Sequence, residues 1–237
     1  MANDWQAAAS PRQGGPTVDR VRVTESPLPA GDFSTWLGEI GGALHGDRGS
    51  DVPCGGCTAC CTSSQFVHIA PDETDTLAHI PSALRFPAPG LPAGHVLLGY
   101  DERGHCPMLV DNRCTIYEHR PRTCRTYDCR VFPAAGVEVD DVDKSLIAQQ
   151  VRRWRFSYED ASGQVRHAAV RAAATYLAEH PEGVPGGVPS ATQRAVLAVE
   201  VHGAFLTAGQ DDAEVLCVPE PAPDAVRAEL DRWAGNQ

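Results

Sequence analysis

The chain has 237 residues, which is long enough for one large domain or for one domain with an extension, and it can bury a core without disulfides. Its formal net charge is -11, and an acidic surface repels phosphate backbones, so we expect no nucleic-acid partner. The N-terminus lacks the apolar core of a signal peptide, and no run reaches the roughly 18 apolar residues of a membrane-spanning helix. These features predict a cytoplasmic protein that does not enter a membrane.

The first half of the chain is predicted to be a tail, a helix and several short strands. Residues 1–30 carry Ser, Pro and Gly without apolar periodicity, which predicts a disordered tail. Asp32 is a suitable cap for a helix over residues 33–44, where the apolar residues share one face. The remaining elements expected here are strands over 65–70, 95–100 and 107–110, an acidic helix over 71–80 opened by Pro71, a Pro-rich loop over 81–94, and a helical turn over 115–119.

The second half is predicted to be mainly helical. Apolar periodicity predicts helices over 143–156, 164–180 and 225–233, and the capping box Ser190-x-x-Gln193 begins another helix. A short strand is expected over 214–218. The predicted fold is therefore α+β, with a cysteine-rich, metal-organised core of short strands flanked by helices. Its expected parts are a tail over 1–30, a cysteine-cluster domain over 31–157, and a helical extension over 158–237 packed on the same core.

Eight of the nine cysteines fall within one stretch of the chain. They are Cys54, Cys57, Cys60, Cys61, Cys106, Cys114, Cys124 and Cys129. A thiolate is a soft anionic ligand that selects zinc, copper(I) and iron–sulfur clusters. Clustered cysteines in the reducing cytoplasm are more often metal ligands or catalytic groups than disulfides. The cluster therefore predicts a soft-metal site.

The spacing of the cysteines leaves two kinds of metal open. The run C-x2-C-x2-C partly matches the bacterial ferredoxin pattern, so Cys54, Cys57, Cys60 and one later cysteine are candidates for a [4Fe–4S] cluster. The directly following Cys61 departs from that pattern, and adjacent side chains in an extended backbone point to opposite sides, so the two neighbours can serve different centres. Zinc is the alternative, although the downstream gaps are wider than those of zinc knuckles.

Five residues near the cysteines are candidates for supporting a metal. Arg120 and Arg125 lie beside the later cysteines, where they can offset thiolate charge and donate hydrogen bonds to sulfur. Tyr117 and Tyr127 flank the same cysteines, and His105 precedes Cys106 and could replace a thiolate. Each also has an ordinary structural explanation, since arginine is mostly exposed and tyrosine commonly packs.

Three motifs carry a resemblance to a known family. The runs CGGCTACC, GHCPMLVDNRC and CTIYEHRPRTCRTYDC occur in order over residues 54–130. Together they resemble the YkgJ-like CxxCxxCC cysteine-cluster family, whose members are described as zinc- or iron-chelating domains. The resemblance implies a metal-chelating role for all eight cysteines. Flagellin lysine N-methylases contain a similar cluster, which makes a link to a modifying enzyme conceivable.

The sequence leaves three functions open. The first is an iron–sulfur protein in redox chemistry or cluster handling, the second is a modifying enzyme supported by its metal, and the third is a zinc-organised scaffold without catalysis. No phosphate-binding loop, dinucleotide fingerprint or nucleophile elbow occurs, so no catalytic residue is assigned. The expected partner is an unidentified protein or small molecule.

Overall fold

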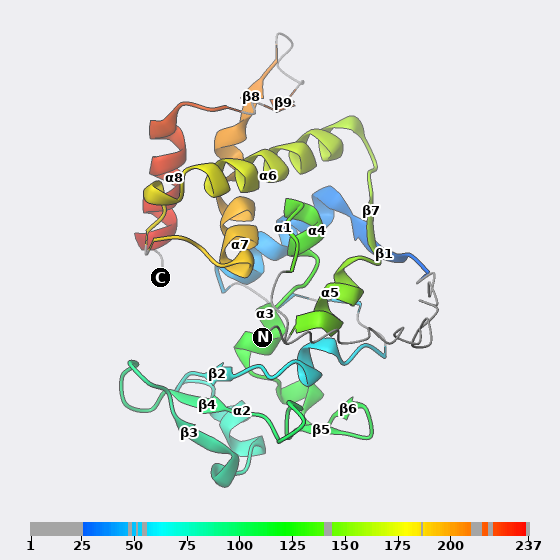
Figure 1. The fold of residues 1–237 in the computed structure, drawn as a ribbon, viewed down its shortest axis with the longest axis vertical. Coiled ribbons are helices and arrows are strands. Elements are labelled where there is room, and N and C mark those ends of the chain that lie inside the picture. The colour runs from blue at the N-terminus through cyan, green and yellow to red at the C-terminus, as the bar shows by residue number, and fades with distance from the viewer. Residues whose placement is uncertain are drawn as a thin grey trace, which may run out of the picture.

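The computed structural model describes residues 26–46, 49–50, 52–53, 56–139, 144–185, 187–209, 215–217 and 220–235. Its architecture is α+β, as predicted, with helices gathered in the upper half of the view and short strands and loops below (Figure 1). Residues 1–25 of the predicted tail lie outside the described residues.

The upper half is a group of helices around the main hydrophobic core. Helix α6 packs on α1, α4 and α7, and α7 also contacts α8. The largest fully buried side chains of this core are Trp36, Phe33, Phe132 and Phe205. The helices are α1 (Phe33–Leu44), α4 (Val131–Ala135), α5 (Ser145–Val151), α6 (Ala161–Glu179), α7 (Ala191–Val201) and α8 (Pro223–Gly235), with 3-10 turns η5 (Pro181–Gly183) and η6 (His202–Phe205).

The helices with a recognisable cap are where the sequence predicts them. The Asp32 carboxylate accepts the Thr35 N–H at 2.9 Å and begins α1, which buries the predicted apolar face. Ser190 and Gln193 form both bonds of the predicted capping box at the start of α7. Helix α6 begins three residues earlier than predicted, because the Asp160 carboxylate caps it by accepting the Gly163 N–H.

Two predictions fail where strands β1 (Leu28–Asp32) and β7 (Trp154–Ser157) pair in parallel. The predicted tail extended to residue 30, yet β1 begins at Leu28. The predicted helix over 143–156 ends at Val151, and the chain continues as β7. Trp154 is 2% exposed and packs in the main core. This packing favours a strand here, although the apolar spacing of the segment is that of a helix. Neither strand has a partner nearby in sequence, and local patterns therefore miss both.

The lower half is built on a three-stranded antiparallel sheet and a second, smaller core. The strand order is β2-β4-β3, with β2 (Val67–Ile69), β4 (Val96–Leu98) and β3 (Arg85–Pro87). Ile69, Ile80, Leu98 and Ile116 form the small core. Strands β2 and β4 lie within the predicted strands over 65–70 and 95–100.

Two details of the lower half correct the prediction. Helix α2 (Thr74–His79) begins three residues after the expected Pro71, because a reciprocal turn forms first: Glu73 N–H donates to the Ala70 carbonyl, and Ala70 N–H donates to the Glu73 carboxylate. The expected loop over 81–94 contains the 3-10 turn η2 (Ser82–Leu84) and strand β3. Pro87 ends β3 at the sheet edge, where its missing N–H is tolerated.

Short hairpins and turns complete the fold. Strands β5 (Leu109–Val110) and β6 (Arg113–Cys114) form a hairpin in which Asp111 and Asn112 have φ of 50° and 58°, as a type I′ turn requires. The predicted helical turn over 115–119 is η3 (Tyr117–His119), and the predicted strand over 214–218 is β9 (Val215–Cys217), paired with β8 (Leu206–Ala208). The 3-10 turn η1 (Ala59–Thr62) and helix α3 (Arg122–Thr126) carry cysteines.

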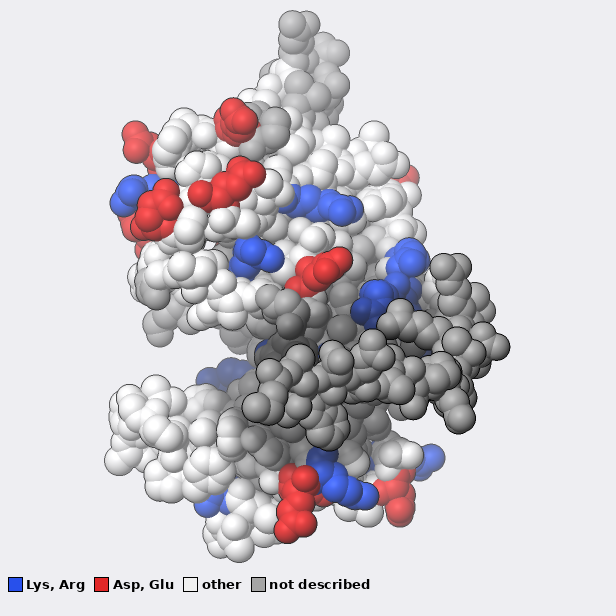
Figure 2. All heavy atoms as spheres, viewed as in Figure 1, with Lys and Arg blue, Asp and Glu red and all other residues white. Residues whose placement is uncertain are grey.

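The surface of the described residues is strongly charged in places. Figure 2 shows acidic side chains gathered over α8 and the neighbouring end of α6. The exposed carboxylates of this region are Glu179, Glu182, Glu220, Asp224 and Asp231. Among the described residues, no helix combines the length and the apolar composition that crossing a bilayer demands.

The half-buried imidazole of His167 predicts a pH-dependent stability. Burial lowers the pKa of His167, whose ring stacks on Phe33 with centroids 4.3 Å apart. Its contribution to stability is therefore complete above the unfolded pKa of about 6.5 and is lost as the pH falls through the lower folded pKa. We expect the free energy of unfolding in urea to fall between pH 7.5 and pH 5, with a smaller fall in His167→Gln. His180→Gln, on an exposed residue, is the control. An identical pH dependence in wild type and His167→Gln would contradict this role.

Candidate metal centre

The cysteine-rich segment passes from the upper helices to the lower sheet and back. None of its described cysteines is in a disulfide. Cys60 and Cys61 lie on η1, Cys114 on β6 and Cys124 on α3, while Cys57, Cys106 and Cys129 lie in connecting segments. Cys54, the first predicted ligand, lies outside the described residues.

One group of thiols surrounds Cys124. Burial is the largest cause that raises the pKa of Cys124 to about 12, and the nearby thiols of Cys61, Cys106 and Cys114 contribute to this rise, because a second negative charge is disfavoured there. Burial also raises the pKa of Cys106, with a contribution from Cys114. The Cys106 N–H donates to the Cys61 carbonyl at 2.7 Å, which joins two segments far apart in sequence. The structure thus brings these four cysteines into one neighbourhood.

A second group of cysteines lies against the main core. Cys129 is 5% exposed and belongs to that core, and Cys57 and Cys60 pack against it. The indole Nε1–H of Trp154 donates to the Cys129 sulfur at 3.2 Å. Burial raises the pKa of the Tyr127 phenol, and Cys60 and Cys129 contribute to that rise, so Tyr127 lies near both thiols. This places Tyr127 beside the cysteines that it was predicted to support.

The described cysteine sulfurs are spaced more widely than the ligands of one bound zinc ion. Four sulfurs at about 2.3 Å from a tetrahedral zinc lie about 3.8 Å from one another. Among the described residues, no three cysteines bring their sulfurs within 4.8 Å of one another. A cluster of several irons and sulfides is larger than a single ion and holds its ligands further apart. The cysteines are soft donors that suit both a zinc ion and an iron–sulfur cluster.

The group that does meet this distance is Asp75, His79 and His119. The two imidazole rings are stacked 3.5 Å apart at 7°, so their in-plane lone pairs run parallel rather than converging on one ion. The Asp75 carboxylate lies 2.8 Å from His119 Nδ1, at hydrogen-bond distance. It lies 3.7 Å from His79 Nδ1, at the distance of an ion pair. All three side chains are substantially exposed. The arrangement is explained as a polar contact between α2 and η3.

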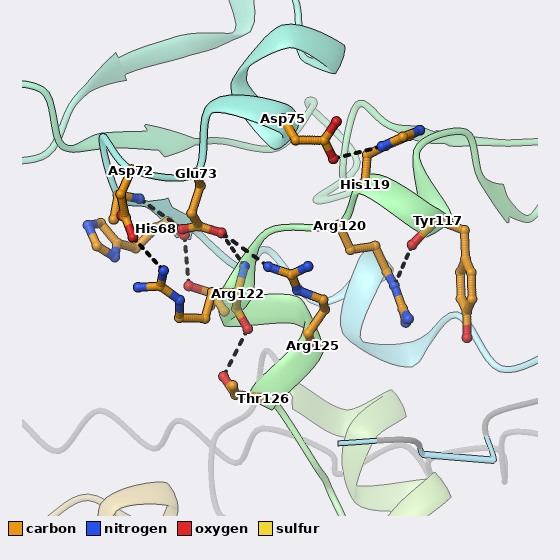
Figure 3. A network of polar contacts seen from close by, with 12 residues as sticks. His68, Asp72, Glu73, Asp75, Tyr117, His119, Arg120, Arg122, Arg125 and Thr126 are labelled. Carbon is orange, nitrogen blue, oxygen red and sulfur yellow. Dashed lines mark hydrogen bonds and ion pairs between the residues drawn. The ribbon is translucent and has the colours of Figure 1, made fainter. Parts of the chain in front are cut away.

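A buried carboxylate fixes helix α3, and with it Cys124, against the lower sheet (Figure 3). Glu73 accepts the Ala70 N–H at 2.9 Å and the Arg122 N–H through its two oxygens. The side chain of Thr123 donates to the carbonyl of His68 on β2 at 2.7 Å. Sequence analysis assigned Glu73 to an acidic first helical turn. The structure instead places it before α2, where it bridges two elements.

The predicted supporting arginines have different surroundings. Arg125 lies 3.9 Å from the Glu73 carboxylate. Arg120 stacks 3.6 Å above the Tyr117 ring and donates from Nε to the Tyr117 carbonyl at 2.7 Å. Arg120 also favours the thiolate of Cys124, so it lies near that thiol. Tyr117 is 49% exposed on the outer side of this contact.

His105 is held through its backbone. Its N–H donates to the Asp101 carboxylate at 2.8 Å, and its carbonyl accepts the Asp101 N–H at 2.8 Å. These bonds shape the turn that presents the adjacent Cys106. The imidazole of His105 is half-buried.

A buried ion pair brackets Cys129, and sequence analysis did not find it. Asp128 and Arg130 are 3% and 4% exposed, and their charged groups lie 2.8 Å apart. The Asp128 carboxylate also accepts Trp36 Nε1–H at 2.9 Å and Ser50 Oγ–H at 2.8 Å. Arg130 donates to the Ala30 carbonyl at 3.0 Å. The sequence shows a charge on each side of this cysteine, but it does not show that both charges are buried.

Breaking this pair is expected to destabilise the protein strongly. Asp128→Asn leaves the Arg130 guanidinium buried without its counter-charge, which costs about 3–5 kcal/mol. Arg232→Met removes the half-exposed pair with Glu229 and is expected to cost less than about 1 kcal/mol. The free energy of unfolding in urea, measured on both variants, checks the difference. Equal effects would contradict a structural role for the buried pair.

Comparison with known proteins identifies the cysteine-rich segment. Residues 53–150 match the family model CxxCxxCC, described as "Putative zinc- or iron-chelating domain". No curated protein and no solved structure gives a significant match. The matched residues run from the segment before Cys57 to α5, and helices α6, α7 and α8 lie outside the match. Over residues 53–150 this chain is therefore similar to the CxxCxxCC family.

Proposed function

We propose that this protein is an iron–sulfur protein that acts in redox chemistry or in the handling of clusters. The observation that supports the proposal is the gathering of the described cysteine thiols in two neighbourhoods, one against the main core and one against the small core. A [4Fe–4S] cluster would be held by cysteine thiolates. It would supply one-electron chemistry when bound.

The surroundings of the thiols support this chemistry. The Trp154 N–H bonded to the Cys129 sulfur and the nearby Arg120 are the kinds of donor and charge that tune the potential of an iron–sulfur centre. Cys106 and Cys124 are half-buried thiols whose raised pKa values keep them protonated in the absence of a metal. Metal loading therefore releases protons, as expected of a thiolate site.

A zinc-organised scaffold is the second candidate, favoured by the description of the matched family and by the short spacing of the first cysteines.

A modifying enzyme would need a pocket beside the thiols. The cleft of about 940 Å³ in the described residues lies between α6 and α8 and contains none of the predicted metal-site residues. A cytoplasmic location, where thiols are kept reduced, belongs to the same proposal.

The identity of the metal is tested by anaerobic purification of the full chain. We expect a brown protein with broad visible absorption and with iron and acid-labile sulfide in equal amounts, because a [4Fe–4S] cluster contains both. Metal analysis and the absorption spectrum measure this. A colourless protein with stoichiometric zinc and no sulfide would overturn the iron–sulfur function and support the scaffold.

Removing the metal is expected to loosen the matched domain more than the helices outside it. The small lower core contains four buried apolar residues, so much of its stability must come from ligand binding. After chelation we expect faster amide hydrogen exchange over residues 56–130 and a lower melting temperature by circular dichroism. The amides of α6 and α7, which are buried in the main core, serve as the internal control. An unchanged melting curve would count against a structural contribution of the metal.

A further inference from the structure

Helix α5 carries a buried amide whose nitrogen lacks a partner among the described residues. Gln150 is 6% exposed, and its Nε2 is a buried side-chain nitrogen that makes no hydrogen bond to the part of the chain that the structure describes. Buried polar groups almost always have a partner, because a buried donor that is left unsatisfied keeps the full cost of leaving water. The donor end of this amide therefore requires an explanation.

The orientation of the amide is fixed by its other end. Arg153 Nη1 donates to Gln150 Oε1 at 3.1 Å, and Arg153 Nε donates to the Ser26 carbonyl at 3.2 Å. A guanidinium group can only donate, so the amide oxygen must face it and the amide nitrogen must take the other position. A flipped amide would set N–H groups against N–H groups. The unpartnered atom is thus the donor nitrogen.

Gln150 lies on the side of α5 that packs inward. Ile147 and Val151, which neighbour it on the helix surface, belong to the main core, whereas Gln149 is exposed. An amide buried among apolar side chains is costly unless it is hydrogen-bonded. Its burial at this position is therefore explained if the nitrogen finds an acceptor in another state of the protein.

The turn η1, which bears cysteines, packs against α5 and is drawn in cyan below it (Figure 1). It contains Cys60 and Cys61, and Cys57 and Cys60 pack against the same main core as the buried face of α5. A neutral thiol is a weak acceptor, whereas a metal-bound thiolate is an anionic one that forms stronger hydrogen bonds. Metal loading would supply the kind of acceptor that the amide nitrogen needs.

We infer that Gln150 donates a hydrogen bond from Nε2 to a cysteine thiolate of the metal centre held by η1. This inference rests on the proposed function and adds a residue that stabilises the metal-bound state and sets its properties. Outer donors to metal ligands commonly change metal affinity by 10- to 100-fold. Hydrogen bonds to sulfur also set the reduction potential of an iron–sulfur centre, because they stabilise its more negative, reduced state.

The substitution Gln150→Met tests this role, because methionine has a similar length and removes the donor. Gln149→Met, on the exposed neighbour in the same helix, is the matched control. In the full chain loaded without oxygen, we expect Gln150→Met to lower the reduction potential, measured by spectroelectrochemistry. We also expect it to weaken metal retention against a chelator by about tenfold. Gln149→Met should match the wild type in both measurements, and equal values for the wild type and Gln150→Met would overturn the inference.

The metal-free chain gives a readout of opposite sign. Without a thiolate acceptor, the replacement of Gln150 by methionine removes an unsatisfied buried donor. We expect Gln150→Met to raise the urea midpoint of the metal-free chain and to lower that of the loaded chain. A purely structural role, through the oxygen bonded to Arg153, would lower both midpoints by the same amount. That result, or a metal-free Gln150→Met chain that does not fold, would overturn the inference.

The result can be separated from that of the proposed function. If the wild type carries zinc without sulfide, the iron–sulfur function is overturned. The chelator measurement on the zinc-loaded chain still tests the hydrogen bond, because a zinc-bound thiolate is the same kind of acceptor. Weaker zinc retention in Gln150→Met than in Gln149→Met would support the inference, and equal retention would overturn it. A wild type that binds no metal overturns both.

Discussion

The structure depends on one buried ion pair, that between Asp128 and Arg130. Removing two charges from water costs several kcal/mol for each ion, and it is tolerated only when hydrogen bonds satisfy both groups. Here the partners come from the most distant parts of the described chain: Ala30 on β1, Trp36 on α1 and Ser50 in the following loop. The pair therefore ties the start of the described chain to the end of the cysteine-rich segment.

This constraint also explains how the cysteines are held at defined positions without disulfides. Cys129 lies between two immobilised side chains and is fixed further by Trp154. Cys124 depends on another buried charge, the Glu73 carboxylate, which secures α3 on the lower sheet. Each thiol neighbourhood is thus supported by its own core and its own buried carboxylate. The sites are built on packed elements even though most of the cysteines lie in short or irregular segments.

The sequence predicts best where the cause of a structure is local. The Asp32 cap and the Ser190 capping box each act within a few residues, and both are observed. The cysteine motifs that match the CxxCxxCC family could also be recognised from the sequence, because each motif is a short continuous run of residues. The pairing of β1 with β7 and the late start of α2 depend on contacts with other segments.

Predictions for individual charged residues were limited by burial. Arg130 and Glu73 look like ordinary exposed charges in the sequence, because charged residues are rarely buried. Their role becomes evident only when the partners are known: Asp128 for Arg130, and the Arg122 backbone for Glu73. The grouping of cysteines likewise depends on the small core, which assembles from residues scattered over the lower half.

The parallel pairing of β1 with β7 has a consequence for how the chain can reach its folded state. Leu28 lies beside Trp154, so the whole cysteine-rich segment is enclosed in the loop between these strands. Closing a loop costs entropy that grows with the logarithm of its length, by about 0.6 kcal/mol for each doubling. Any link between cysteines inside the loop shortens the effective path between its ends. Cofactor loading would then favour the docking of the N-terminal strand.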